Sequence, residues 1–335
     1  MNDDIAPIRL LRSINKNKKF DGLWREIDEY RHKFKDNWPA WCFLPLSVWY
    51  NVVLKSEPRL AQSSHPTKMG LVNALATSMA AVGAWRPTQG IYVFDDEAFE
   101  AIGRSDIDTQ IPVEHILHLP AWSVYIKWID DRYDGFFATL SYDVSDSRKY
   151  LDLTFLDDNN GGLPQPRYVK IPLQKSMSVA DAINSLKQEI FEANRRDATY
   201  TALAEEYYEE LRVDDTAIAI SLLLYLCCGK PEIDGIQAVP SIYHPQETKV
   251  KNGYRLYPPD KPKVHLVAEK IGYKLREYKA QNQVTPTNKK MPPHMRKAHF
   301  KRYWYGPKKS PHRCYDFIWI PQLPINMPDY DFEDL

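Results

Sequence analysis

The stretch WSVYIKWIDDRYDGFFATLSYDVSDSRKYLDLTF, from Trp122 to Phe155, decides the fold class. It contains three short runs rich in aromatic and β-branched residues, separated by clusters of Asp and Gly at which a chain turns. Similar runs precede and follow it. The pattern predicts an antiparallel meander of short strands at Ile91–Phe94, Trp122–Trp128, Phe136–Tyr142, Tyr150–Phe155 and Tyr168–Pro172.

Helical periodicity occurs on both sides of these strands. In the first third, helices are predicted for Asp21 to Trp38, for Trp41–Leu54 and for the segment between Pro66 and Val82. After the strands, Ser178 and Asp181 have the spacing of a capping box. Further helices are predicted at Thr199–Leu211, Asp215–Cys228 with Gly229 as its C-cap, and Val267–Tyr278.

We therefore expect an α+β protein with helices flanking a mostly antiparallel sheet and a basic C-terminal module. The predicted divisions are a helical N-terminal region at 1–88, the sheet with its helices at 89–228, a Pro-rich linker or ordered loop at 229–263, and a basic module with an acidic tail at 264–335. A short strand is also expected at Ile318–Ile320.

Composition limits the class of protein. No signal peptide is visible, and the longest apolar run, Ala217–Cys228, is too short to span a bilayer, so a cytoplasmic location without a membrane partner is expected. The four cysteines show no metal-ligand spacing, which favours buried, reduced thiols and no metal. No phosphate loop, nucleophile elbow or dinucleotide fingerprint is present, and no cofactor is expected.

The charged side chains are unevenly distributed. The chain has 44 Lys and Arg and 44 Asp and Glu, but ten of the cations and none of the acids lie between Tyr278 and Tyr315. The rest of the chain therefore has a net charge of −10. Such a segment is typical of a nucleic-acid partner, with docking on the acidic body or binding to another protein as alternatives. The residues expected to contact nucleic acid are Lys289, Lys290, His294, Arg296, Lys297, His299, Lys301, Arg302, Trp304, Lys308 and Lys309.

Two histidines in this segment also suit catalysis. One imidazole as base and one as acid, beside a cation, is an arrangement that cleaves RNA, and His294 and His299 flank Arg296. Binding to phosphate or a purely structural role are the alternatives. The prolines at 292 and 293 predict that the segment begins extended and becomes helical after His294.

A zinc site in the same segment is disfavoured. Its candidate ligands are His294, His299, His312 and Cys314, whose spacing does not suit zinc. The His115-x-x-His118 pair after Glu114 is more typical of ordinary surface or core structure.

A protein-binding surface is expected on the sheet. Trp122, Tyr125, Trp128 and Phe136 are too many aromatics for one face of a small core, so some should be exposed beside the Asp-rich turns at 130–134 and 157–158. Arg86 after Trp85 is a candidate clamp for a peptide carboxylate or carbonyl, with capping of its own helix as the alternative. The expected protein-binding residues are Arg86, Trp122, Tyr125 and Trp128.

An ordered set of short strings resembles one known family, the second-described family of type V-A anti-CRISPR proteins of phages, prophages and plasmids. The strings span the chain from about Gly83 to Ile320. They are Gly83-Ala84-Trp85-Arg86, Thr88, Gly90-Ile91-Tyr92, Leu119-Pro120, Trp122, Val124-Tyr125, Pro164-Gln165-Pro166, Ser178-Val179-Ala180, Leu226-Cys227, Pro231, Ile271-Gly272, Pro293-His294, Arg296, His299, Tyr303-Trp304 and Gly306.

The basic motif departs from the family's pattern. The family's usual pattern is Pro-His-x-Arg-Arg-Gly-His-Trp. This chain has Pro293-His294-Met295-Arg296-Lys297-Ala298-His299-Phe300 instead. Lys297 keeps the charge but loses the guanidinium fork, and Ala298 removes a glycine. The chain is thus a distant member whose target can differ.

The resemblance implies a function. Family members block biogenesis of the type V-A Cas effector nuclease by recognising part of the effector polypeptide and lowering its mRNA in a translation-dependent way. This implies a non-enzymatic regulator in the bacterial host cytoplasm whose partners are a target polypeptide, such as the nascent effector or another protein, and RNA or the ribosome. The alternatives are a mobile-element ribonuclease using His294 and His299, or a plasmid or phage nucleic-acid-binding accessory protein.

Overall fold

The computed structural model describes residues 5–61, 66–107, 110–130, 132–157, 166–196, 213–282, 294–308, 313–321 and 323–325. The predicted helix at Thr199–Leu211 lies outside these residues. Among the helices that are described, none has the length and apolar character needed to cross a membrane.

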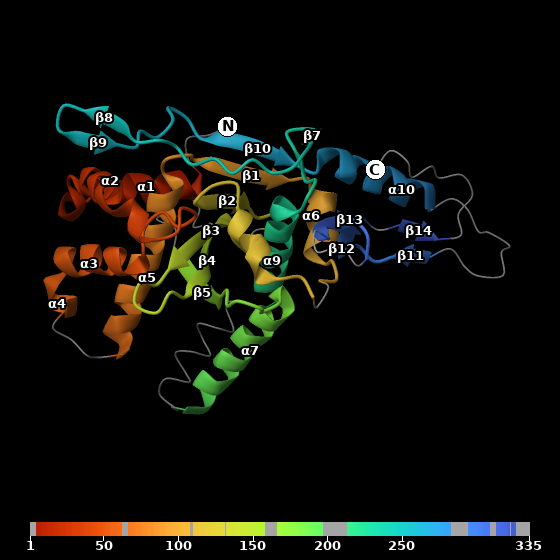
Figure 1. Cartoon of the computed structure of the whole chain (residues 1–335), viewed down its shortest axis with the longest axis horizontal. Coiled ribbons are helices and arrows are strands. Elements are labelled where there is room, and N and C mark those ends of the chain that lie inside the picture. The colour runs from red at the N-terminus through yellow and green to blue at the C-terminus, as the bar shows by residue number, and fades with distance from the viewer. Residues whose placement is uncertain are drawn as a thin grey trace.

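A mixed sheet forms the middle of the molecule (Figure 1). Its strand order is β5-β4-β3-β2-β1-β10-β6-β7. The bounds are β1 (Gly90–Phe94), β2 (Ser123–Lys127), β3 (Gly135–Tyr142), β4 (Lys149–Leu156), β5 (Pro166–Pro172), β6 (Glu232–Ile233), β7 (Ile236–Gln237) and β10 (Lys263–Val267). Strands β2 to β5 pair antiparallel in sequence order, which confirms the meander for these four.

The first strand departs from the expected meander. β1 runs parallel to both β2 and β10, with Ile91 opposite Tyr125 on one side and Val264 on the other. The expectation of an antiparallel β1 is wrong, because the chain leaves β1 through a helix and crosses over before it enters β2.

One face of the sheet is covered by the N-terminal helices. These are α1 (Ala6–Lys16), α2 (Leu23–Phe34), α3 (Leu46–Ser56), α4 (Pro58–Ala61) and α5 (Pro66–Trp85), with short 3-10 helices η1 (Lys18–Phe20) and η2 (Lys35–Asn37). Their buried side chains form one core with Tyr125, Phe137 and Leu156 of the sheet. Pro66 occupies the first residue of α5, as predicted.

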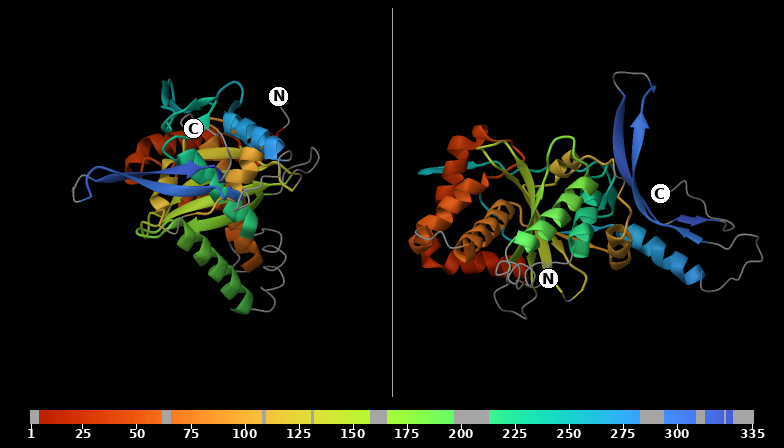
Figure 2. Two further views of the ribbon diagram at one scale, coloured as in Figure 1. Left: turned by 90° about the vertical axis from the view of Figure 1, so that its right-hand side faces the viewer. Right: turned by 90° about the horizontal axis from the view of Figure 1, so that it is seen from below.

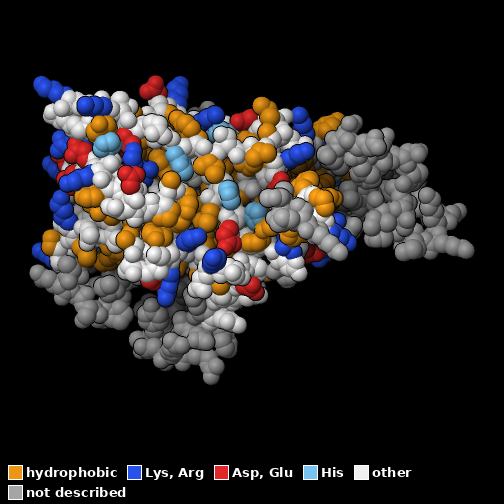
Figure 3. All heavy atoms as spheres, viewed as in Figure 1, with side chains coloured by type: hydrophobic (Ala, Val, Ile, Leu, Met, Phe, Trp, Pro, Cys, Tyr) orange, Lys and Arg blue, Asp and Glu red, His pale blue; other side chains and the backbone are white. Residues whose placement is uncertain are grey.

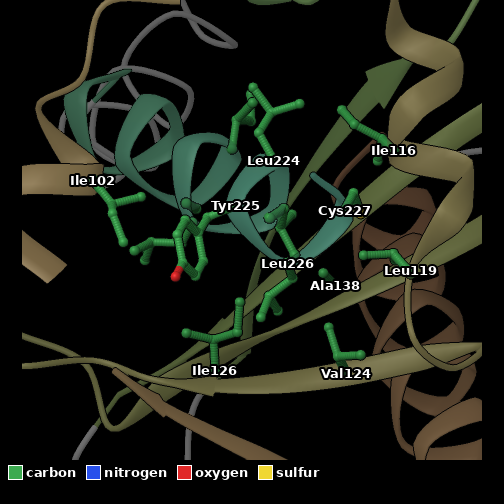
Figure 4. Close-up of a cluster of buried hydrophobic side chains, with 14 of the residues drawn as sticks. Ile102, Ile116, Leu119, Val124, Ile126, Ala138, Leu224, Tyr225, Leu226 and Cys227 are labelled. Atoms are coloured by element: carbon green, nitrogen blue, oxygen red, sulfur yellow. The ribbon is translucent and has the colours of Figure 1, made fainter. Parts of the chain in front are cut away.

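The other face is covered by a second set of helices. These are α6 (Asp96–Gly103), η3 (Val113–His118), α7 (Val179–Arg196), α9 (Val213–Cys227) and α10 (Glu269–Asn282). Figure 4 shows Tyr225 and Leu226 of α9 pointing toward Ile126 and Val124 of β2. The sheet is thus the middle of three layers, and the α+β class with helices on both sides of a mostly antiparallel sheet is confirmed.

Local sequence signals explain several helix ends. The Ser178 hydroxyl accepts from Asp181 N at 3.0 Å and the Asp181 carboxylate accepts from Ser178 N at 3.2 Å, which confirms the capping box of α7. Asp95 caps α6 by accepting from Glu97 N and Ala98 N. Gly229 follows the end of α9 closely, but its backbone is not in the left-handed conformation typical of a glycine C-cap. A Cβ on Gly229 would lie 1.8 Å from Oδ2 of Asp316, so glycine allows this close approach instead.

The last third of the chain contains more strands than expected. The segment 229–263 holds β6, β7 and a second hairpin of β8 (Thr248–Val250) and β9 (Gly253–Arg255). Beyond α10 lie β11 (His294–Arg296), β12 (His299–Tyr305), β13 (Cys314–Ile320) and β14 (Leu323–Ile325). The expected helix after His294 is therefore wrong, while the strand at Ile318–Ile320 is confirmed as part of β13. The predicted domain divisions stay a prediction.

Candidate functional site

Strands β12 and β13 form a long antiparallel pair, called here the C-terminal hairpin. Figure 2 shows it extending away from the body of the molecule. Its register places Phe300 opposite Trp319 near the body and Trp304 opposite Tyr315 farther out. Because side chains alternate along a strand, Phe300, Arg302 and Trp304 lie on one face, and Lys301, Tyr303 and Tyr305 lie on the other.

The base of the C-terminal hairpin is built into the core. Phe300, Phe317 and Trp319 are buried among the residues of the second core. The Trp319 indole N–H donates to the Ser105 hydroxyl at 2.7 Å. Asp106 and Phe300 are also joined, since Phe300 N donates to Asp106 O at 3.1 Å. The hairpin is therefore held at a fixed place on the body.

The outer half of the hairpin exposes aromatic rings. Tyr303, Trp304 and Tyr305 are 41%, 45% and 52% exposed. Three large aromatic side chains exposed at consecutive positions can serve as anchors for a partner.

Cations surround these rings. The Arg313 guanidinium lies 4.7 Å from the Trp304 ring centroid, and Arg302 lies 5.8 Å from it. Lys301 lies 5.3 Å from the Tyr303 ring. Lys297 and Lys308 are exposed as well. This combination of rings and cations is chemically suited to nucleic acid, whose bases stack and whose phosphates are anionic.

The remaining predicted nucleic-acid residues are placed only in part. Lys289, Lys290 and Lys309 lie outside the described residues, as does His312. The backbones of His294 and Arg296 lie in β11, but their side chains lie outside the described part of the structure. His299 begins β12, and its Nδ1 lies 3.2 Å from the carbonyl oxygen of Lys297.

A neutral histidine supports the hairpin from the body. The His115 ring packs against Phe317 and Tyr315, with centroids 4.3 Å and 5.6 Å apart. Burial, and then the charge of His118, lower the pKa of His115 to about 4. His115 is therefore uncharged at neutral pH and acts as a packing residue. No cluster able to hold a metal ion occurs among the described residues.

The aromatics predicted to bind protein are not on the surface. Trp122, Tyr125, Trp128 and Phe136 are all buried, at 3% exposure or less. The prediction that some of them are exposed is wrong, because helices cover both faces of the sheet and each face needs its own aromatic filling. Trp128, for example, packs edge-on against Phe99 of α6 with centroids 5.2 Å apart.

The Arg86 side chain is also buried, and its guanidinium is hydrogen-bonded inside the protein. Its Nη1 donates to the Leu256 carbonyl at 2.7 Å, and its Nη2 donates to Asp28 at 2.5 Å. It therefore ties the N-terminal helices to the chain after β9 and neither clamps a peptide nor caps its own helix. Trp85 is fully buried and donates to Gly90 O at 2.8 Å.

The Asp-rich turns have internal partners too. Asp130 is held by Arg132, Asp134 accepts from Tyr125 at 2.5 Å and from Lys127 at 2.7 Å, and Asp157 is bridged by Arg167 at 3.2 Å. Asp131 and Asp158 lie outside the described residues. These carboxylates support ordinary turn and ion-pair structure.

The described cysteines are not activated as nucleophiles. Cys42, Cys227 and Cys228 are free and buried, which confirms the expectation for these three. Burial raises the pKa of Cys42 and of Cys228 to about 12, so both stay protonated thiols. None of them is placed to act as a nucleophile.

A groove at one edge of the sheet was missed by the sequence reasoning. It has a volume of about 380 Å³ and is lined by residues of β1, β2, β6, β7 and β10. The first half of residues 238–247, a segment called here the strap, completes the lining. Tyr92, Val124 and Tyr243 contribute apolar surface, and Ile236 and Val239 are exposed beside it. Figure 3 shows hydrophobic side chains spread over the middle of this view of the molecule. The Pro-rich composition of 229–263 gave no sign of the groove.

The strap is fastened at its far end. Tyr243 N donates to Pro120 O at 2.8 Å, and the His244 ring stacks on Trp122 with centroids 4.5 Å apart. Glu247 then pairs with Lys35 at 2.7 Å. β7 is the last strand of the sheet order, so its outer edge has no described partner strand, and Ile236 of β7 lines the groove. An extended polypeptide is the ligand that such an edge accepts.

Comparison with known proteins agrees with this architecture. A family model described as AcrVA2-like, anti-CRISPR type V subtype A2 family, matches residues 92–327. A crystal structure described as that of AcrVA2 has the same fold, with a TM-score of 0.63 at 20% identity. The alignment covers 95% of this chain and 99% of that chain. No curated protein sequence matches the chain.

Proposed function

The chain belongs to the AcrVA2-like anti-CRISPR type V subtype A2 family, and we propose that it lowers production of a type V-A Cas effector. In this proposal the protein recognises the effector polypeptide and acts through the effector mRNA or the translation apparatus. It does so by binding, without catalysing a reaction. The two activities need two surfaces, one for an extended polypeptide and one for RNA.

The C-terminal hairpin carries the proposal. Its exposed rings and cations extend from a body whose remaining sequence is acidic, so the hairpin is the part of the described chain best suited to a polyanion. Phosphate contacts from Lys297, Lys301 and Lys308 would give affinity without sequence preference. Such binding suits a regulator whose choice of target comes from a polypeptide.

The groove at β7 supports the polypeptide arm. Its apolar lining would receive side chains of an extended segment, and the open edge of β7 would pair with that segment's backbone. Asp234 and His265, joined at 2.9 Å, add one polar contact point at the groove. Reading a short extended segment suits a nascent chain that has not yet folded.

The two arms can be separated in translating bacteria that express a type V-A effector. The hairpin variant combines Lys301→Gln and Lys308→Gln, and the groove variant combines Ile236→Asp and Val239→Asp. The control combines Lys249→Gln and Lys251→Gln, two exposed lysines of the β8–β9 hairpin. Each protein is used in a pulldown with and without RNase, and effector mRNA is quantified in parallel.

We expect the groove variant to lose the effector polypeptide under both conditions. The hairpin variant should keep the polypeptide but lose its RNase-sensitive partners, and effector mRNA should rise toward the level without inhibitor. The control should behave as the unmodified protein. If both variants repress the effector as strongly as the control, neither surface serves this function.

A further inference from the structure

One side-chain cluster on the C-terminal hairpin does more than supply positive charge. Trp304 and Tyr315 lie opposite each other in the β12–β13 register, with ring centroids 4.8 Å apart and planes inclined by 50°. Arg302 lies 5.5 Å from the Tyr315 ring, and Arg313 lies over Trp304. Two aromatic rings and two guanidinium groups thus share one face of the hairpin.

The cluster is incompletely satisfied. Nearly half of the Trp304 side chain is exposed. Arg302 donates to the Gln110 side chain, but its Nε has no hydrogen-bond partner among the described residues. The Nε of Arg313 likewise has no hydrogen-bond partner among the described residues. Both Nε atoms are buried, so a ligand would meet the terminal nitrogens of these two partly exposed side chains.

These features select a ligand that is both planar and anionic. A nucleobase stacks on an indole or phenol ring, while the adjoining phosphate accepts from a guanidinium. In a duplex the base faces are covered by neighbouring bases, so only a single strand can use the rings. An acidic peptide would meet the cations but would leave the rings unused.

We propose that Trp304 and Tyr315, flanked by Arg302 and Arg313, form a base-stacking site for single-stranded RNA. The proposal rests on the proposed function, because it specifies how the C-terminal hairpin contacts RNA. His115 positions Tyr315 in this site by packing edge-on against its ring. Lys301, on the opposite face, contributes phosphate attraction without touching the stacked base.

The test measures binding of the purified full chain to labelled oligo-adenosine, oligo-uridine and a duplex of the same length, over a range of salt concentrations. The variants are Trp304→Ala, Trp304→Phe and the Lys301→Gln, Lys308→Gln pair. Tyr257→Ala serves as control, since Tyr257 is also exposed to solvent but lies in a loop far along the chain from the hairpin. Thermal unfolding of each variant checks the fold.

Stacking and charge give different signatures. Trp304→Ala should weaken single-strand binding by roughly 5- to 150-fold, with the salt slope unchanged. Trp304→Phe should retain most of the affinity because a ring remains. The lysine pair should instead reduce the slope of log affinity against log salt by ~0.7 for each lost contact. Duplex affinity should not depend on Trp304.

Three results would overturn the stacking site. If Trp304→Ala leaves single-strand affinity unchanged while the lysine pair loses it, the hairpin contacts only phosphates, and the proposed function survives. If Trp304→Ala weakens duplex binding equally, the ring is not reading exposed bases. If oligo-glutamate binds the hairpin and no RNA does, the hairpin is a protein-binding surface, and the RNA arm of the proposed function fails with it.

Discussion

The Arg86 guanidinium donates a hydrogen bond to the Asp28 carboxylate, with 2.5 Å between Nη2 and Oδ1, and both side chains are buried. The second Asp28 oxygen accepts from Leu256 N at 3.0 Å. This pair joins α2 to the end of α5 and to the segment after β9. A residue that sequence reasoning assigned to ligand binding therefore holds together three distant parts of the chain.

Asp28→Ala should lower the free energy of unfolding by about 3–5 kcal/mol, because it leaves the Arg86 charge buried and unpaired. Glu26→Ala is the matched control on the same helix. Glu26 pairs with Lys55 at 3.0 Å, but both side chains are exposed, so its loss should cost less than about 1 kcal/mol. Urea unfolding measures both, and equal effects would show that the buried pair contributes no more than a surface pair.

The positions of β1 to β5 followed from local pattern, but the pairing of β1 did not. The runs at β2 to β5 are joined by short turns, so neighbours in sequence pair in space. One of the two strands that pair with β1 is β10, which lies far along the chain and has only five residues before a helix. Nothing within such a short run indicates which strand it will join.

The prediction that aromatic side chains of the sheet are exposed was wrong for a different physical reason. Phe136 and Phe137 are consecutive and both fully buried, Phe136 in one core and Phe137 in the other. A strand that is apolar at successive positions is covered on both faces, whereas a strand with one exposed face alternates. That signal was present in GFFATL and indicated a middle layer more than an interface.

The basic segment carried a similar signal. The run FKRYWY is rich in residues that favour strands, and it forms β12. The helix expected after His294 was based on the two prolines that precede it, and this prediction is wrong. Composition alone identified the cations. The groove beside β7 has parts from strands far apart in sequence, so it could not be assembled from local pattern.

Gly229 provides a test of how the C-terminal hairpin is docked. Gly229→Ala would place a methyl group against Asp316 of β13, so it should lower the free energy of unfolding by about 1–3 kcal/mol. Adding Asp316→Ala should recover much of this loss by removing the clash. Gly70→Ala, with no atom near its new Cβ, should be neutral or stabilising. Loss of stability in Gly229→Ala without any rescue would mean that Asp316 is not the obstacle.

His244 should make the protein less stable in acid. Burial, assisted by the charge of Arg31, lowers the pKa of His244 to about 4. Its pKa in the unfolded chain is about 6.5, so the unfolded state takes up the proton first as pH falls. The contribution to stability is therefore complete above about pH 6.5 and is lost between there and about pH 4.

The comparison that isolates this effect is His244→Phe, which keeps a ring over Trp122 but cannot gain a proton. Between pH 7 and pH 4.5 the unmodified protein should lose about 1 kcal/mol more stability than the variant, after allowance for solvent screening. Urea unfolding at the two pH values gives the difference. Parallel pH profiles for the two proteins would mean that His244 titrates normally in the fold.

The histidines of the basic segment distinguish a binding protein from a ribonuclease. His299 lies at the start of β12, with its Nδ1 turned to the carbonyl oxygen of Lys297. We expect purified protein to leave labelled single-stranded RNA intact, with EDTA or with Mg²⁺. Arg296→Ala should reduce RNA binding at least as much as His294→Ala or His299→Ala, because a guanidinium binds phosphate more strongly than a neutral imidazole.

A ribonuclease would behave in the opposite way. A general acid or base typically contributes 10²–10⁴-fold to the rate, so His299→Ala would abolish cleavage while RNA affinity stayed nearly the same. The decisive measurement is a single preparation of each protein assayed for both binding and cleavage. Turnover that is present in the unmodified chain and absent in His299→Ala, at equal affinity, would replace the binding protein by an RNA-cleaving enzyme.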